Sequence, residues 1–291
     1  MKKLKIGFTD THDHLAAFFN HVLSMRFDVE IVKEKEPDFL IFGDRNFGND
    51  NLSFDKKKVT KIFYTGENQR PDDYDCHYAI TFDHNYKPWH YRLPLWVIYL
   101  WALKHVHKSK YDKNSILKNN IKSKKDFCSF VVKNEKPTER KDFYHKLSEY
   151  KKIDSGGPLF KNIEGELDGE VAKIDFLSTR KFNLCFESYS HPGYVTEKIL
   201  HAFLAGTIPI YWGSPTIEKD FNPHAFINAH NFNNFDDLIK YVKEVDTNDK
   251  FYNWMNNQPK FTGNVLPDYL LYNNFLNWFE AIVYNKAMMR Q

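Results

Sequence analysis

Apolar residues in the first part of the chain gather in short runs separated by polar turns and by one helical pattern. Five runs have the length and the bulky apolar content of buried strands: residues 4–8, 27–32, 39–42, 59–64 and 76–82. Between the first two runs, residues 13–25 place apolar side chains at helical spacing. Strands that alternate with helices predict an open α/β sheet.

The same alternation begins again after residue 126. Strands are expected at residues 127–132, 153–157, 182–186, 207–211 and 226–228. Helices are expected at residues 138–150, 194–204, 236–245, 249–256 and 267–288, with Thr138 as the N-cap of the first of these. The pattern therefore predicts two α/β domains, residues 1–125 and 126–266, and a final segment, 267–291, whose helix packs back toward the first domain.

Two of the expected helices carry cations near their first turns. In the helix at 194–204, Glu197 and Lys198 point away from the apolar stripe. Free backbone N–H groups and the positive end of the helix dipole make a first turn a seat for an anionic ligand. On spacing alone, a solvated charged pair is the commoner arrangement. Arg140, in the first turn of the other helix, is unfavourable beside that dipole and so indicates an anionic partner.

Composition and charge narrow the classes of protein. The 291 residues are 42% hydrophobic and 17% aromatic, enough apolar material for two globular cores. A net charge of +3 suits a small anionic substrate and does not call for nucleic acid. Cys76, Cys128 and Cys185 are far apart, which favours buried thiols over disulfides or a zinc site.

The sequence also bears on location. No apolar stretch reaches the length needed to span a bilayer, and MKKLKIGF enters a strand and not a signal peptide, so a soluble, cytoplasmic protein is expected. The basic segment from Lys104 to Lys125 is expected to be an exposed connection between domains. Its charge would also allow peripheral contact with an anionic inner membrane surface.

A second interpretation starts from TDTHDHL, directly after the first strand. Asp10, His12, Asp13 and His14 have the chemistry of metal ligands, and an H-x-H at this place occurs in metal-dependent hydrolase barrels. The eight βα repeats of such a barrel are missing from the pattern. A capping Asp beside exposed His side chains is the commoner arrangement.

A third interpretation rests on the aromatic segment from Trp89 to Leu103, which includes Trp96, Tyr99 and Trp101. Most of these side chains are expected in the core. One or two at a surface could stack on sugar rings, which would suit a non-catalytic glycan-binding module.

Three blocks between residues 181 and 215 favour one family over these alternatives. The strings FNLCFE, GYVTEK and TIPIYWGSP, in this order, resemble the signature of the α-1,3/α-1,4-fucosyltransferases, glycosyltransferase family 10. Weaker resemblance runs from Lys61, through YTGEN and the Arg140 segment, to the region of Asp236. The first 55 residues offer little to match.

The resemblance implies an inverting transfer of L-fucose from GDP-fucose to a hydroxyl, expected to be O3, of N-acetylglucosamine in a LacNAc or Lewis-type glycan. It implies a GT-B fold, two Rossmann-like domains facing each other across a cleft, with the acceptor on the first domain and GDP-fucose on the second. It implies no cofactor and no metal for the chemistry.

The resemblance also assigns roles to residues. It makes Glu67 of YTGEN the general base and places Arg140 at the donor phosphate. For the implied transfer, Lys198 and the Tyr194 hydroxyl are candidates to meet the charge that grows on the departing GDP. Glu197 is expected to hold sugar hydroxyls of the donor. Where the family usually carries Asn after F-E, this chain has Ser188, so a donor contact made by that amide would be shorter, water-mediated or absent.

Overall fold

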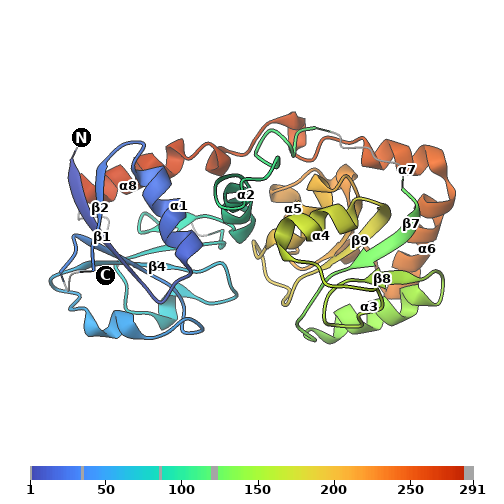
Figure 1. The fold of residues 1–291 in the computed structure, drawn as a ribbon, viewed down its shortest axis with the longest axis horizontal. Helices are drawn as coiled ribbons and strands as arrows, with labels where there is room; N and C mark the ends of the chain where they lie inside the picture. Colours follow the sequence, from blue (N-terminus) through green and yellow to red (C-terminus); the bar gives the residue numbers. More distant parts are fainter. Residues whose placement is uncertain (1, 34–35, 85–86, 119–123, 285–291) are drawn as a thin grey trace. The chain divides into compact units, whose positions relative to one another are not determined.

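The computed structural model describes residues 2–33, 36–84, 87–118 and 124–284. The chain divides into two compact units, Met1–Ala102 with Pro267–Gln291 and Leu103–Leu266. Both are α/β units built on a parallel sheet (Figure 1), which confirms the predicted fold class. The boundary lies at Leu103, so the basic segment expected at the end of the first domain belongs to the second unit.

The first unit holds a six-stranded sheet in the order β2-β1-β3-β4-β5-β6, with every pair parallel. Its strands are β1 (Lys3–Thr9), β2 (Asp28–Ile31), β3 (Phe39–Phe42), β4 (Thr60–Tyr64), β5 (Tyr78–Thr81) and β6 (His90–Arg92). Its helices are α1 (Asp13–Leu23), α2 (Leu95–His105, which runs into the second unit) and α8 (Asn273–Tyr284). Short 3₁₀ turns lie at Asp50–Ser53, Pro71–Asp73 and Asp268–Leu270.

Helix α8 lies with the first unit although it comes last in the chain (Figure 1). Phe279 packs its ring 5.2 Å from Phe39 and 5.7 Å from Phe27, measured between ring centroids. Arg26 donates a hydrogen bond to Asn277, at 2.6 Å. The buried aromatic contacts stabilise the helix against the sheet because they remove apolar area from water.

The second unit holds a five-stranded parallel sheet in the order β11-β10-β9-β7-β8. Its strands are β7 (Asp126–Phe130), β8 (Ile153–Ser155), β9 (Arg180–Phe186), β10 (Ile208–Trp212) and β11 (Ile227–Asn228). Its helices are α3 (Thr138–Ser148), α4 (Gly169–Leu177), α5 (Glu197–Leu204), α6 (Phe235–Thr247) and α7 (Asp249–Asn256). Four 3₁₀ turns complete the described part: Ile217–Lys219, Pro223–Ala225, Ala229–Asn231 and Thr262–Asn264.

Several predicted elements need correction. Helix α5 begins at Glu197 and not at residue 194, because residues 187–196 form a loop whose last residue, Thr196, is the N-cap. The N-cap of α3 is Pro137 and not Thr138. Within the helix expected at 267–288, the described part is a 3₁₀ turn followed by α8, and residues 285–288 lie outside the described residues. Strand β6 and helix α4 were not predicted.

Candidate functional site

A buried carboxylate joins the end of β9 to the start of α5. Glu187 is completely buried, and its side chain accepts hydrogen bonds from the Thr196 backbone N–H at 2.8 Å and from the Thr196 hydroxyl at 2.6 Å. The Lys198 ammonium donates to Glu187 Oε2 at 2.9 Å and to Thr196 Oγ1 at 2.9 Å. The pair therefore fixes a cation at the first turn of α5, where N–H groups also point outward.

Gly213, directly after β10, packs closely against the Glu187 side chain. A Cβ atom on Gly213 would lie 2.5 Å from the Glu187 Cγ, so only glycine fits there. The next residue, Ser214, accepts the Gly193 backbone N–H at 2.8 Å and donates its own N–H to the Tyr211 hydroxyl at 2.9 Å. The WGSP block thus packs against Glu187 and holds the loop between β9 and α5 by hydrogen bonds.

A second group of charges surrounds Glu197 on its helix. The Glu197 carboxylate lies 3.5 Å from the Lys173 ammonium and 3.9 Å from that of Lys198. Burial alone would raise the pKa of Glu197, but Lys198 and Lys173 lower it overall. Lys173, on α4, also lies 3.9 Å from Glu170, whose carboxylate is 3.4 Å from the buried His201 ring. Helices α4 and α5 run beside each other in the second unit (Figure 1).

Arg140 lies in α3 with its guanidinium buried, at 1% exposure. It donates to the carbonyl of Phe186 from Nε at 3.2 Å and from Nη2 at 2.6 Å. Its Nη1 donates to the carbonyls of Asn134 and Lys136, each at 2.6 Å. Arg140 therefore ties the loop before α3 to the end of β9, and most of its N–H groups are already used by these three carbonyls.

Tyr194 and Ser188 lie in the loop between β9 and α5. Tyr194 is buried at 1% exposure, and its carbonyl accepts the Tyr211 hydroxyl at 3.2 Å. Ser188 follows Glu187 directly and is half-buried. Its neighbour Tyr189 is exposed.

The structure brings four of the predicted donor residues into one electrostatic cluster. Burial lowers the pKa of Arg140, and the neighbouring groups Glu187, Tyr194 and Glu197 act against that change. Burial likewise opposes the charge on Lys198, but Glu187 and Glu197 raise its pKa overall. Sequence reasoning missed Glu187 as the centre of this cluster. The available signal was a carboxylate directly after a buried strand of the second domain.

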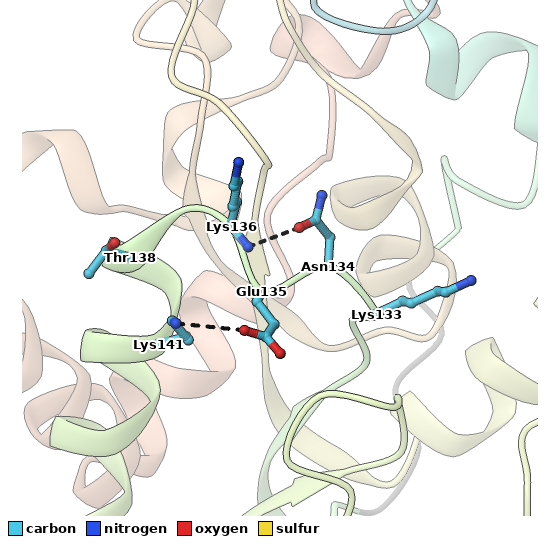
Figure 2. Close-up of a pocket in the computed structure, with 6 residues that line it drawn as sticks. All are labelled: Lys133, Asn134, Glu135, Lys136, Thr138 and Lys141. Carbon is cyan, nitrogen blue, oxygen red and sulfur yellow. Dashed lines mark hydrogen bonds and ion pairs between the residues drawn. The ribbon is translucent and has the colours of Figure 1, made fainter. Parts of the chain in front are cut away.

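A pocket of about 750 Å³ opens on the loop between β7 and α3 (Figure 2). Figure 2 shows the side chains of Lys133, Lys136 and Lys141 around it, with Glu135 4.0 Å from Lys141. The Lys136 N–H donates to Asn134 Oδ1 at 2.9 Å. The Arg140 carbonyl contacts lie on this same loop. The pocket lining is thus predominantly basic, which suits an anion.

The predicted base, Glu67, lies in the first unit, in the loop after β4. Its backbone N–H donates to Thr65 Oγ1 at 3.0 Å, and that hydroxyl donates to Asp44 Oδ2 at 2.8 Å. Glu67 is half-buried. The loop is fixed on its other side as well, because the space beside Gly66 is filled by the Leu95 side chain.

The metal-hydrolase interpretation has little support in the structure. The Asp10 carboxylate accepts the N–H groups of Asp50 and Asn51, each at 2.9 Å, and thereby holds a loop. The His12 ring lies edge-on to Phe47, with the centroids 4.2 Å apart. Across residues 2–33, 36–84, 87–118 and 124–284, no group of three His, Cys, Asp or Glu side chains could hold a metal ion.

The remaining sequence expectations concern aromatic, cysteine and basic side chains. Trp96 and Trp101 are buried in the core, and Trp89, Tyr91 and Tyr99 are half-buried, so none of these side chains is fully exposed for a glycan-binding surface. The three cysteines are buried and free, as predicted.

The basic segment is more closely packed than a connection would be. Tyr111 is 3% exposed, and Lys124 donates to the Ser178 carbonyl at 2.8 Å. Residues 119–123 of this segment lie outside the described residues. Within the described helices, none is long and apolar enough to cross a bilayer.

Two family models match separate parts of this chain. The model described as glycosyltransferase family 10 (fucosyltransferase), C-terminal part, matches residues 121–261. The model described as the alpha-(1,3)-fucosyltransferase FucT N-terminal domain matches residues 5–99. The chain belongs to glycosyltransferase family 10. The expectation that the first 55 residues have little to match is therefore wrong.

Curated relatives from distant organisms resemble this family 10 chain. Alpha-(1,3)-fucosyltransferase FucT of Helicobacter pylori is 34% identical over 262 residues, covering 79% of this chain and 53% of FucT. Human 4-galactosyl-N-acetylglucosaminide 3-alpha-L-fucosyltransferase 9 is 37% identical over 150 residues, covering 50% of this chain and 40% of the human protein. The chain thus spans about half of the length of the bacterial relative.

Solved structures of alpha1,3-fucosyltransferase resemble almost the whole family 10 chain. One matches with a TM-score of 0.79 at 27% identity, covering 99% of this chain and 92% of the other. A second, solved with GDP-fucose, matches with a TM-score of 0.76 at 28% identity, covering 98% and 92%. The two parallel α/β units are those of the GT-B class.

Proposed function

We propose that this protein transfers L-fucose from GDP-fucose to O3 of N-acetylglucosamine in a LacNAc-type or Lewis-type glycan, with inversion at the sugar carbon. The observation that carries the proposal is the Lys198 ammonium held by the buried Glu187 at the first turn of α5, 2.9 Å away. A fixed cation beside free helix N–H groups is suited to a diphosphate.

The donor is assigned to the second unit. As the bond between the fucose C1 and the diphosphate oxygen breaks, the departing GDP keeps the electron pair and gains negative charge. Lys198 and the N-terminus of α5 would stabilise that charge, because they are fixed before the reaction begins. Arg140 holds the loop of the basic pocket in place, and the lysines of that loop would attract the nucleotide. Glu197 would accept hydrogen bonds from donor hydroxyls, and Tyr194 and Ser188 would complete the donor contacts.

The acceptor and its base are assigned to the first unit. The acceptor oxygen forms the new bond to C1 from the face opposite the leaving group, and the Glu67 carboxylate takes up the proton of that hydroxyl. The hydrogen bonds from Glu67 through Thr65 to Asp44 fix the backbone of the base loop. A base that is held in position before the reaction raises the rate, because its proper placement has no further entropy cost.

We also propose that the reaction needs no metal, because Lys198 and the helix N-terminus supply the positive charge that a divalent ion provides in other glycosyltransferases. A further proposal, based on the positive charge of the Lys104 to Lys125 segment, is contact of this segment with anionic membranes. Lys104 lies 4.0 Å from Asp112, and Lys124 donates to two backbone carbonyls, so part of the positive charge is used within the protein.

The test is a transfer assay with GDP-fucose and N-acetyllactosamine, with and without EDTA. We expect the acceptor to gain the mass of one deoxyhexose at the same rate in both, and NMR of the product to show an α linkage at O3. Intact GDP-fucose after prolonged incubation would contradict the proposed activity. Loss of rate in EDTA would contradict the proposal of metal independence.

A further inference from the structure

We propose that Phe47, with the His12 ring at its edge, is the platform on which a pyranose ring of the acceptor stacks. The inference rests on the proposed function and identifies a subsite for its acceptor. Phe47 is 42% exposed although it is a large apolar side chain, and His12 is exposed beside it. Sugar rings have apolar C–H faces, which can pack on an exposed aromatic ring.

The loop that carries Phe47 is held in one conformation by polar contacts. The Phe47 N–H donates to the Asp44 carbonyl at 3.0 Å. On the other side, the Asp10 carboxylate accepts the N–H groups of Asp50 and Asn51. Between them, Gly48 has a φ of +142°, and a Cβ there would lie 2.5 Å from Asp10 Oδ1. The backbone of this loop therefore holds an apolar ring at the surface, where the exposed part of the ring gives no stabilisation by burial.

The same contacts connect this ring to the loop of the base. Strands β1, β3 and β4 are parallel neighbours, so the loops that follow them leave the same edge of the sheet. The Asp44 carboxylate joins two of these loops, because it accepts the Thr65 hydroxyl at 2.8 Å, and Thr65 in turn accepts the Glu67 N–H at 3.0 Å. A ring stacked on Phe47 would thus be positioned by the element that also fixes the base.

The surroundings of Phe47 suit a sugar better than an apolar partner. Asn46 and Asn49, on either side of Phe47, are exposed amides that can donate to and accept from hydroxyl groups. Carbohydrate sites combine an apolar contact with a few such polar groups. The His12 ring packs against the Phe47 ring with 68° between the ring planes, and Phe47 is still 42% exposed.

The kinetic test compares Phe47→Ala with Leu52→Ala, an apolar side chain of the same loop that is 71% exposed. With GDP-fucose and N-acetyllactosamine, we expect Phe47→Ala to raise the acceptor KM about tenfold, with kcat within about twofold of wild type. The KM for GDP-fucose should not change, and Phe47→Trp should keep the wild-type acceptor KM. His12→Ala should raise it about threefold, with recovery in His12→Phe. An unchanged KM in Phe47→Ala, or an equal rise in Leu52→Ala, would overturn the inference.

A binding measurement separates this inference from the proposed activity. Saturation-transfer NMR in the presence of GDP should give N-acetyllactosamine signals of equal strength on the wild type and on Leu52→Ala, and a clearly weaker signal on Phe47→Ala. A wild type that binds the disaccharide through Phe47 but leaves GDP-fucose intact would contradict the proposed function alone. Equal signals from wild type and Phe47→Ala would contradict the platform alone.

Discussion

The Lys198 ammonium lies 2.9 Å from the Glu187 carboxylate, which is completely buried. The two groups have different roles. Glu187 also accepts hydrogen bonds from the backbone N–H and the hydroxyl of Thr196, and so fixes the loop before α5. The Lys198 side chain is 15% exposed and can still reach a ligand. Because the carboxylate cannot reach water, its charge is tolerated only while its partners stay in place.

Replacing Lys198 should therefore affect stability and binding separately. Lys198→Met leaves Glu187 buried without its cation, and we expect a loss of about 3–5 kcal/mol in the free energy of unfolding of the second unit. Adding Glu187→Gln to Lys198→Met removes the unpaired charge and should restore much of that loss. GDP affinity should stay low in both variants. Urea denaturation and titration calorimetry measure the two effects, and normal GDP affinity in the double variant would remove Lys198 from the donor site.

Replacing Arg140 can separate the effect of its positive charge from the effect of the hydrogen bonds that its guanidinium makes. Arg140→Lys keeps the positive charge but cannot reach the carbonyls of Asn134, Lys136 and Phe186 together. We expect it to lose about 3 kcal/mol of stability and to bind GDP as weakly as Arg140→Ala does. If calorimetry shows that Arg140→Lys binds GDP like the wild type, the residue acts through its charge and not through the loop it holds.

Glu67→Gln tests the assignment of the base. The amide keeps the size of the side chain but cannot accept a proton, so turnover should fall by about a hundredfold or more while the Kd for GDP-fucose stays unchanged. Glu30→Gln, a change to an exposed carboxylate paired with Lys3, is the matched control and should keep full activity. Turnover of Glu67→Gln close to that of the wild type would exclude Glu67 from the mechanism.

The pH dependence of stability should reveal Lys260, which is 4% exposed and donates to the carbonyls of Asn256 and Gln258. Burial lowers the pKa of Lys260 from 10.5 to about 8. Between these two values the unfolded chain holds the proton and the folded chain does not, so folding becomes more favourable as pH rises. Relative to Lys260→Met, the wild type should gain up to roughly 3 kcal/mol between pH 8 and 10.5.

The exposed Lys250 provides the control for this measurement, because Lys250→Met should change stability by the same small amount at every pH in urea denaturation. A stability difference between wild type and Lys260→Met that stays constant from pH 7 to 10.5 would show that Lys260 keeps its ordinary pKa in the folded chain.

Much of this architecture could be predicted because strand burial and helical spacing are local properties. Strand β3 and helix α7 have the predicted limits, and both sheets lie where the apolar runs indicated. Strand β6 was missed because the three residues His90–Arg92 fall within a longer aromatic run that also contains the start of α2. Where apolar residues follow each other without a helical or strand period, the sequence does not show where one element ends and the next begins.

The sequence named individual candidate site residues and could not show how they are organised. Glu197 and Lys198 stand next to each other in the sequence, which suggested a pair. The closer partner of Lys198 is Glu187, at 2.9 Å against 3.9 Å for Glu197. Glu187 lies eleven positions earlier, and only the folding of the loop between β9 and α5 brings the two together. Contacts that depend on a loop conformation leave no periodic signal in a sequence.

The arrangement around Lys198 can be tested most directly by determining the crystal structure of the protein soaked with GDP. We predict that the diphosphate lies at the first turn of α5, within hydrogen-bonding distance of the Lys198 ammonium. Density for GDP at another place in the protein, with Lys198 contacting only Glu187 and Thr196, would contradict the account.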